Sequence, residues 1–242
     1  MEPGAGEGLG DFQREVHLAT TTELGHRLRA GPSHVWQRLN DWWLNIDTTY
    51  DSSAGPEPCE RDGADDYRAQ YQGANYLYLE QIARLVTRDA PGQLVFYDIG
   101  CGKGRPLCVM ARHPFRRVVG VEVREDLAEI ARVNARNVRR RMAPIEVLNA
   151  DASSVDYTDG DVFFLFNPFG PPTLQAVIDS LERSLTLAPR DVTLIYYHAV
   201  HEAVLKRSRW LECYGRLPTY SGLQISFWRN RNQKLERARG IA

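Results

Sequence analysis

Three glycines at alternate positions, Gly100, Gly102 and Gly104, follow an apolar run that ends in Asp98-Ile99. Because glycine has no Cβ, the backbone at these positions can turn tightly and come close to a bound ligand. A strand, a glycine-rich loop and a helix in succession form the junction at which open α/β sheets bind nucleotide-like cofactors. The sequence therefore predicts a cofactor site in this loop, and the spacing of its residues decides between cofactors.

The spacing disfavours two phosphate-binding loops. A P-loop needs the pattern GxxxxGK followed by Ser or Thr, whereas Lys103 is followed here by Gly104. A dinucleotide fingerprint counted from Gly100 needs a glycine where Arg105 stands, and we expect Arg105 to crowd the helix–strand contact. Asp98 would also repel a pyrophosphate. The loop therefore favours a cofactor without phosphate whose cationic groups an acidic strand end can attract.

The sequence DIGCGKG at residues 98–104 closely resembles the first motif of class I S-adenosylmethionine-dependent methyltransferases. The resemblance covers about residues 71–229 of the chain. Glu122 ends the next predicted strand, about 20 residues after the glycines, where a carboxylate can bind both ribose hydroxyls. Asp151 follows the third strand, where family members often place an acid that reaches the adenine amine. Glu122 alternatively suits a helix N-terminus, and Asp151 a turn or helix cap.

The resemblance implies an enzyme that uses S-adenosylmethionine. No metal site is expected, because none of the four cysteines forms a CxxC pair. The resemblance places the cofactor-binding residues in the motifs above, in the turn after the fourth strand and in the segment before the first strand. The implied set is Asp98, Gly100, Cys101, Gly102, Gly104, Glu122, Val123, Asp151, Ala152, Asn167 and Tyr71.

The methyl acceptor is expected to meet the run Phe166-Asn167-Pro168-Phe169-Gly170. This run looks like a shortened Asn-Pro-Pro-aromatic motif of amino-group methyltransferases. The resemblance implies that the Asn167 side-chain oxygen and the Pro168 carbonyl accept hydrogen bonds from the target nitrogen, while Phe169 holds the acceptor. Asn167 and Phe169 are thus the predicted catalytic residues. A single proline before Phe169 disfavours a nucleobase, an oxygen acceptor stays open, and the alternative is a plain strand-to-helix turn.

Several other side chains have both a structural and a functional interpretation. His198 and His201 are more typical of loop histidines than of metal ligands, although His198 can serve as a base or substrate contact. The aromatic groups are expected either to pack or to line the site, with a substrate lid as the alternative for the tryptophans: Tyr67, Tyr71, Tyr76, Tyr78, Trp36, Trp42 and Trp43. The basic run Arg132–Arg141 favours a solvated helix end over nucleic-acid contact.

Strand and helix patterns alternate from residue 94 to residue 207, which predicts an α/β fold. The predicted strands are 94–98, 117–122, 145–149, 161–166 and 191–198, and the predicted helices are 105–112, 125–141, 172–187 and about 201–206. Residues 210–214 and 223–229 are typical of a hairpin. Together with the resemblance, the pattern predicts a doubly wound, mostly parallel seven-stranded sheet with a C-terminal antiparallel hairpin and an N-terminal helical extension.

Three regions are expected along the chain. Residues 1–64 form the helical extension, with two helices within 11–46, and this extension can act as a substrate lid. Residues 65–230 form the S-adenosylmethionine-binding domain, which begins with a helix over 65–88. Residues 231–242 form a polar tail.

Composition limits the partners and the compartment. The 242 residues carry a net charge of −1, so no global field recruits nucleic acid. Four scattered cysteines, no secretory signal and no long apolar run favour a cytoplasmic protein without a membrane partner. The expected acceptor is a small molecule or a protein side chain, most readily through nitrogen. The alternatives are an RNA or DNA methyltransferase and a non-catalytic S-adenosylmethionine-binding scaffold.

Overall fold

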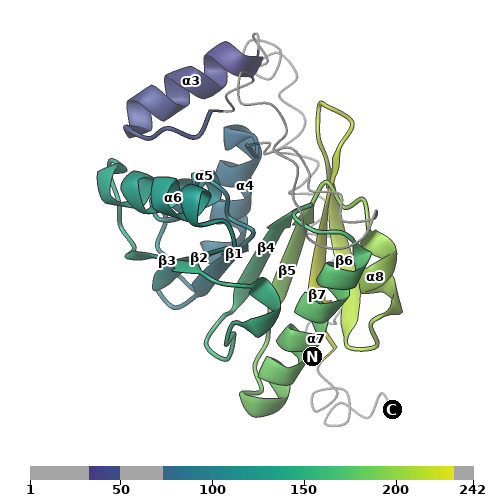
Figure 1. Cartoon of the computed structure of the whole chain (residues 1–242). Coiled ribbons are helices and arrows are strands. Elements are labelled where there is room, and N and C mark those ends of the chain that lie inside the picture. The colour runs from purple at the N-terminus through teal and green to yellow at the C-terminus, as the bar shows by residue number, and fades with distance from the viewer. Residues whose placement is uncertain (1–32, 50–72, 232–242) are drawn as a thin grey trace, which may run out of the picture.

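The computed structural model describes residues 33–49 and 73–231. They form one seven-stranded sheet with the strand order β3-β2-β1-β4-β5-β7-β6 (Figure 1). The strands are β1 Val95–Ile99, β2 Arg117–Glu122, β3 Ile145–Asn149, β4 Val162–Phe166, β5 Thr193–Tyr197, β6 Leu211–Pro218 and β7 Gln224–Asn230. The helices are α3 Ser33–Leu44, α4 Tyr76–Thr87, α5 Arg105–Met110, α6 Glu125–Asn137, α7 Pro171–Leu187 and α8 Glu202–Arg207, with a short 3₁₀ helix, η1, at Ala152–Ser154.

Six strands run in one direction and β7 runs against them. Strands β1 to β5 pair in parallel, whereas β7 pairs antiparallel with both β5 and β6. The predicted mostly parallel sheet with a terminal hairpin is confirmed. The chain proceeds outward from β1 to β3 and then returns to β4 beside β1, so the order of strands reverses between β1 and β4. Open α/β sheets bind ligands at the carboxyl ends of the strands at such a reversal.

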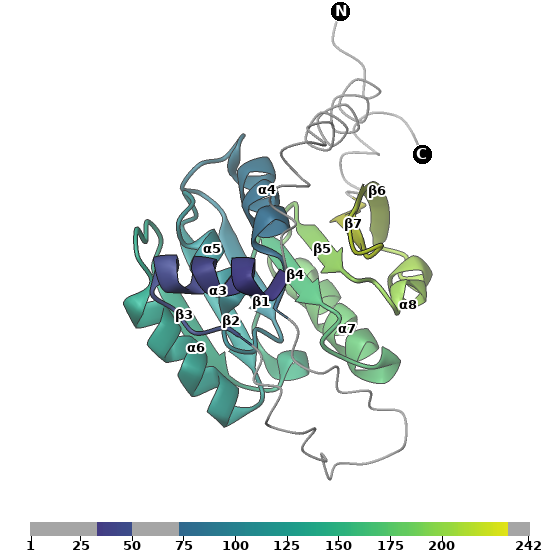
Figure 2. The same ribbon diagram turned by 90° about the horizontal axis from the view of Figure 1, so that it is seen from above.

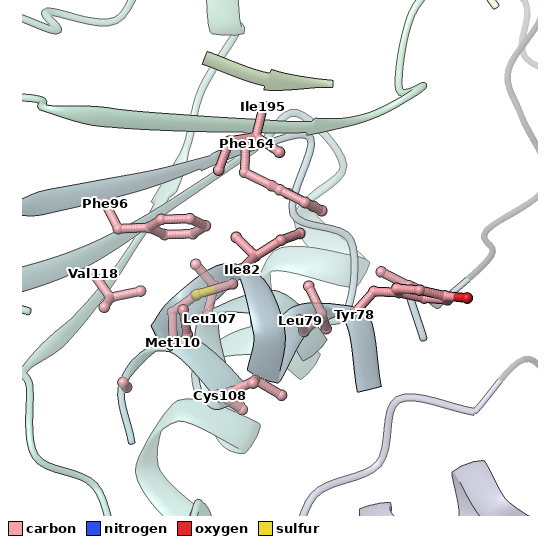
Figure 3. Packing of buried hydrophobic residues seen from close by; sticks show 14 of the residues in the cluster. Tyr78, Leu79, Ile82, Phe96, Leu107, Cys108, Met110, Val118, Phe164 and Ile195 are labelled. Carbon is pink, nitrogen blue, oxygen red and sulfur yellow. The ribbon is translucent and has the colours of Figure 1, made fainter. Parts of the chain in front are cut away.

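Helices cover both faces of the sheet and create two hydrophobic cores. Helices α4, α5 and α6 cover one face, and α7 and α8 cover the other (Figure 1). On the first face, Leu79 and Ile82 of α4 pack toward Phe96, Phe164 and Ile195 of the sheet (Figure 3). Strands buried on both sides need continuous apolar runs, which is what the sequences of β4 and β5 supply.

Helix α3 lies outside the layer of α4, α5 and α6 (Figures 1 and 2). Of the tryptophans expected to pack, Trp36 and Trp42 are 38% and 73% exposed, whereas Trp43, 40% exposed, contacts the guanidinium groups of Arg112 and Arg140. The buried anchors are Leu44 and Ile46, which join the core on the α4–α6 side. The last residues of α3 and the extended segment after it therefore attach this helix to the domain.

The boundaries of three helices differ from the sequence-based expectation. Helix α4 begins only at Tyr76 because the Asn75 side chain accepts a hydrogen bond from the Leu77 amide at 2.9 Å and caps it. Helix α6 ends at Asn137 rather than at residue 141, since the backbone turns extended at Val138. Helix α3 ends at Leu44 because Asn45 adopts a positive φ of 61°. Among the described helices, none is long and apolar enough to span a bilayer.

Candidate active site

The glycine loop lies at the carboxyl end of β1, and its backbone is fixed by the neighbouring strand. Gly100, Gly102 and Gly104 have φ values of 81°, 52° and 80°, a region in which residues with a Cβ are strained. The amides of Gly100 and Cys101 both donate to the Val121 carbonyl, at 2.8 and 3.0 Å. Each of the three alternate glycines thus has a left-handed backbone conformation within one loop.

Glu122 holds the other side of the same loop. One carboxylate oxygen accepts the Gly102 amide and the other accepts the Arg124 amide, each at 2.9 Å. The Asn149 side chain donates to the Glu122 carbonyl at 3.0 Å and fixes the end of β2. A carboxylate offers about four acceptor positions. Glu122 therefore organises the glycine loop and keeps acceptor capacity for hydroxyl groups of a ligand.

Asp98 places a buried carboxyl group beneath the loop. Its side chain is 1% exposed, and within the described part of the chain its Oδ2 atom has no hydrogen-bond partner. Burial, and then the nearby Glu122 carboxylate, raise the pKa of Asp98 well above its ordinary value. A buried polar atom without a partner costs free energy. A cationic or hydrogen-bond-donating ligand at the end of β1 would satisfy it, so this site fits the ammonium end of S-adenosylmethionine.

The turn after β4, which holds Asn167 and Pro168, packs directly against the glycine loop. A Cβ added to Gly100 would lie 2.4 Å from the Pro168 Cβ and 3.8 Å from the Phe169 ring. No side chain fits there, so the absence of a Cβ at Gly100 is what lets the turn after β4 approach the glycine loop. The two motifs, far apart in sequence, meet at the reversal between β1 and β4.

Two non-glycine residues with positive φ stand side by side at the acceptor end. Phe166 and Tyr197 are paired at the ends of β4 and β5, and the next residues are Asn167, with φ 42°, and His198, with φ 56°. Backbone strain of this kind persists only where the surrounding structure enforces it, and it gathers at functional sites. The structure thus brings His198 next to the predicted catalytic Asn167.

The side-chain oxygen of Asn167 already has one partner in the protein. It accepts a hydrogen bond from the Tyr196 hydroxyl at 3.1 Å, and Asn167 is 7% exposed. Sequence reasoning missed Tyr196. The strand alternation of β5 offered a weak signal, because Tyr196 and Tyr197 must point to opposite faces of the sheet.

Aromatic rings surround this end of the sheet. The Tyr197 ring lies 4.6 Å from the Phe166 ring and 6.2 Å from the Tyr78 ring, measured between centroids. Tyr78 also accepts a hydrogen bond from the Tyr220 amide at 2.8 Å. Tyr76 and Tyr78 are buried, so packing, one of the two interpretations weighed for these tyrosines, describes both.

The remaining predicted cofactor residues lie in different surroundings. Val123, next to Glu122, is an apolar residue that is 57% exposed, so the ring of a ligand can pack on it. Cys101 is buried, and its sulfur lies 2.8 Å from the position a Cβ would take on Gly120, so its side chain points into the domain. Burial raises the pKa of the Cys101 thiol. Tyr71 lies outside the described residues.

Asp151 is the N-cap of η1. Its Oδ1 accepts the Ser153 amide at 2.8 Å and the Ser153 hydroxyl at 2.7 Å, which corresponds to the capping alternative. Ala152, the first residue of η1, is 6% exposed. Contact of either residue with adenine stays a prediction.

Arg105 does not crowd the contact between helix and strand, contrary to the expectation from its position. Its side chain is 1% exposed, and Nε donates to the hydroxyl of Thr48, in the segment after α3, at 2.7 Å. Arg105 therefore does not disfavour a dinucleotide site, whereas Asp98 and the missing third glycine of the fingerprint do.

Comparison with known proteins identifies the domain. Residues 96–187 match the family model described as a methyltransferase domain. A histone-lysine N-methyltransferase of Dictyostelium discoideum, specific for lysine 79 of histone H3, is 36% identical over 90 residues, which is 32% of this chain. The match spans only 5% of that relative's length.

A solved structure shares the fold, and others are similar at a lower score. Magnesium protoporphyrin IX methyltransferase from Synechocystis PCC 6803, with bound S-adenosylmethionine, is 18% identical with a TM-score of 0.51, and the match covers 65% of this chain and 79% of the other. An RNA methyltransferase from Salinibacter ruber in complex with S-adenosyl-L-homocysteine is 22% identical, covers 64% and 92% of the two chains and has a TM-score of 0.49. Residues 96–187 are thus similar to a methyltransferase domain, and the fold around them is that of a structure solved with bound S-adenosylmethionine.

Proposed function

We propose that this protein transfers the methyl group of S-adenosylmethionine to a nitrogen atom of a protein side chain or small molecule. The observation that carries the proposal is the convergence of three polar groups at one strand reversal. Asp98 is the penultimate residue of β1, Glu122 ends β2 and Asn167 follows β4. The first two suit a cofactor, and the third suits an acceptor beside it.

Each end of the cofactor has a matching group in the chain. The unpartnered oxygen of Asp98 suits the ammonium of the methionine part. The Glu122 carboxylate suits the ribose hydroxyls, because its loop contacts leave acceptor positions free. Val123 is exposed next to Glu122, where an adenine ring would cover it. These assignments follow the family pattern, and the geometry of the described residues is compatible with all three.

Catalysis would rest on positioning of the acceptor. When bound, S-adenosylmethionine supplies a methyl group that is already activated, so orientation can provide most of the acceleration. The acceptor nitrogen forms a bond to the methyl carbon while the carbon–sulfur bond breaks and its electron pair stays on sulfur. The Asn167 side-chain oxygen or the Pro168 carbonyl would accept a hydrogen bond from the acceptor nitrogen and so orient it. An ammonium acceptor must first lose a proton, and His198, next to Asn167, would take it.

A curated relative supports a protein amine as the acceptor. The curated relative is named for methylation of a histone lysine, and it shares 36% identity over the matched 90 residues. The half-buried Phe166 and His198, whose ring centroids lie 6.4 Å apart, suit an amine whose alkyl chain must be held, since aromatic rings provide apolar walls and attract cations. The proposed acceptor is therefore a lysine-type amine, with small-molecule amines as the second choice.

A nucleic-acid acceptor is less favoured because the basic helix end is engaged within the protein. Arg132 pairs with Glu125 and Glu129 at 3.0 and 3.2 Å. Beyond α6, the Arg139 amide donates to the Leu44 carbonyl, and the Arg140 guanidinium carbon lies 5.1 Å from the centroid of the Trp43 ring. Arg139 and Arg140 thus contact α3, whereas Arg132 is paired within α6.

The test is transfer of labelled methyl from S-adenosylmethionine by the purified protein. Protein, nucleic-acid and small-molecule fractions of an extract would be supplied separately. We expect label in the protein fraction that resists nuclease and marks lysine on amino-acid analysis. Label confined to nucleic acid would overturn the acceptor assignment, and cofactor binding without any transfer would favour the scaffold alternative.

Asn167→Ala separates catalysis from cofactor binding in the same assay. Loss of the orienting oxygen should lower turnover by about 10- to 100-fold, as for removal of one or two hydrogen bonds that act in the transition state, with little change in cofactor affinity. Equal losses in turnover and in cofactor affinity would support the alternative that residues 166–170 form only a strand-to-helix turn.

A further inference from the structure

A buried arginine connects the glycine loop to the N-terminal segment. Arg105 is the first residue of α5, directly after Gly104, and it is 1% exposed. Burial of a guanidinium costs several kcal/mol unless its donors are satisfied. Here Nε donates to the Thr48 hydroxyl at 2.7 Å and one terminal nitrogen donates to the Thr48 carbonyl at 2.9 Å. The other terminal nitrogen donates to Gln37 and to the Ala74 carbonyl, at 3.0 and 3.2 Å.

A carboxylate completes this cluster. Asp41 of α3 is 4% exposed, and one of its oxygens lies 3.9 Å from an Arg105 terminal nitrogen. Asp41 accepts both the amide and the hydroxyl of Thr48, each at 2.8 Å, and it also accepts the Tyr76 hydroxyl. The Tyr76 ring lies 4.9 Å from the guanidinium carbon. The charge of Arg105 is thus matched by groups from α3, from residues 45–49 and from the start of α4.

The chain makes room for this arrangement at Gly73. A Cβ on Gly73 would lie 2.1 Å from an Arg105 terminal nitrogen, so only glycine allows the backbone to pass there. The cluster therefore depends on the sequence at three separate places in the chain: α3 with its following segment, the turn before α4, and the first residue of α5.

Two more contacts join residues 47–49 to the loop itself. The Lys103 ammonium donates to the Thr49 carbonyl at 2.7 Å. The Asn134 side chain exchanges hydrogen bonds with the backbone of Asp47 in both directions, at 2.8 Å each, and donates to the Lys103 carbonyl at 2.9 Å. Residues 47–49 thus hold the outer side of the glycine loop, while Glu122 and Val121 hold its inner side.

We propose that Arg105 is a positioning residue for the cofactor, acting through residues 47–49 to hold the glycine loop in its binding conformation. This inference rests on the proposed binding of S-adenosylmethionine at that loop. It assigns the described part of the N-terminal extension to cofactor affinity, a role distinct from acceptor choice. By linkage, a bound cofactor should in turn order residues 47 and 48, whose amides donate to Asn134 and Asp41.

The test compares three variants by calorimetric titration with S-adenosylhomocysteine, at a temperature where circular dichroism shows each to be folded. Arg105→Met removes all four hydrogen bonds, and we expect the dissociation constant to rise at least about 10-fold. Thr48→Val keeps the backbone acceptor and the shape of the side chain and should raise it by about 3-fold. Arg105→Lys should also bind more weakly than wild type, although it keeps the charge, because an ammonium lacks the planar fork that reaches Thr48, Gln37 and Ala74 together.

Arg112→Met is the matched control. Arg112 also contacts α3, with its guanidinium carbon 4.7 Å from the Trp43 ring, but it lies two residues after the end of α5, away from the glycine loop. It should lower the melting temperature and leave the dissociation constant within about 2-fold, a difference below 0.5 kcal/mol. Equal dissociation constants for wild type and Arg105→Met would overturn the inference. Failure of the wild type itself to bind would overturn the proposed function.

Hydrogen exchange gives an independent readout. The amides of residues 47 and 48 should exchange more slowly when S-adenosylhomocysteine is bound to the wild type. This protection should be lost in Thr48→Val and kept in Arg112→Met. Unchanged exchange at both amides on saturation of the wild type would contradict the proposed coupling.

Discussion

The two halves of the candidate active site are built by different means. The cofactor half, between β1 and β2, is shaped by backbone: three glycines with positive φ, a shared carbonyl acceptor at Val121, and two buried carboxyl groups. The acceptor half, after β4 and β5, is shaped by side chains, with two non-glycine residues held at positive φ by their neighbours. The first half follows from local spacing in the sequence, whereas the second depends on contacts across the fold.

The largest effect is expected where the two halves touch. Gly100→Ala would impose a Cβ at φ 81° and place it 2.4 Å from Pro168. Left-handed backbone costs about 1–2 kcal/mol and overpacking about 1–3 kcal/mol, so the free energy of unfolding should fall by about 2–5 kcal/mol. Chemical denaturation measures the change.

Gly92→Ala is the control for that prediction. Gly92 has a similar φ of 76°, but a Cβ there would meet no atom within 4 Å. It should therefore cost only the backbone term, about 1–2 kcal/mol. Equal losses for the two variants would show that the contact between glycine loop and Pro168 contributes nothing.

Asp98→Asn tests the charge within the cofactor half. The amide keeps the size of the side chain but cannot pair with an ammonium, so the dissociation constant for S-adenosylmethionine should rise by about 10- to 100-fold, as for loss of a charged hydrogen bond. The free protein should be at least as stable as wild type at neutral pH, because the variant no longer buries an ionisable group. A large loss of stability with unchanged affinity would assign Asp98 to the fold alone.

The same residue predicts a pH dependence. Burial raises the pKa of Asp98 above its unfolded value of about 3.9, so between these two pKa values the folded protein binds more protons than the unfolded chain. The contribution of Asp98 to stability therefore falls as pH rises through this window. An ammonium ligand favours the carboxylate, so cofactor affinity should rise with pH in the same window. Calorimetry at several pH values should find this rise in wild type, and a matching rise in Asp98→Asn would refute the assignment.

Tyr196→Phe tests the acceptor half with the smallest expected effect. It removes the hydroxyl that donates to the Asn167 side chain at 3.1 Å, at a cost in stability of about 1 kcal/mol. Turnover should fall several-fold, because Asn167 loses the partner that orients it, while cofactor affinity should stay unchanged. A weaker affinity for the cofactor would mean that the two halves are not separable. Stopped-flow transfer assays and titrations measure the two quantities.

Sequence reasoning reached the cofactor half because its signals are local. The bounds of β2 and β3 match the predicted 117–122 and 145–149, and Glu122 stands at the strand end where the spacing placed it. Residues whose roles depend on distant partners were missed or misjudged. Arg105 was expected against the sheet, but its partner Thr48 is 57 residues away in sequence. The end of α6 was placed too late because contacts with α3, such as that of Arg139 with Leu44, favour a non-helical backbone there.

The acceptor half illustrates the same limit. The run from Phe166 to Gly170 suggested an orienting asparagine, yet no local pattern shows that Tyr196 donates to it or that His198 lies beside it. Both follow from the parallel register of β4 and β5, which only the assembled sheet defines.

Titration of S-adenosylmethionine into wild type and Glu122→Gln tests the cofactor site most directly. The Gln amide can accept at only one of the two positions that now bind the Gly102 and Arg124 amides, and it loses acceptors for the ribose. We expect saturable one-to-one binding to wild type, weakened by about 1–3 kcal/mol in the variant. Equal affinities, or no binding to wild type together with binding of a phosphate-bearing nucleotide, would contradict the assignment of this loop.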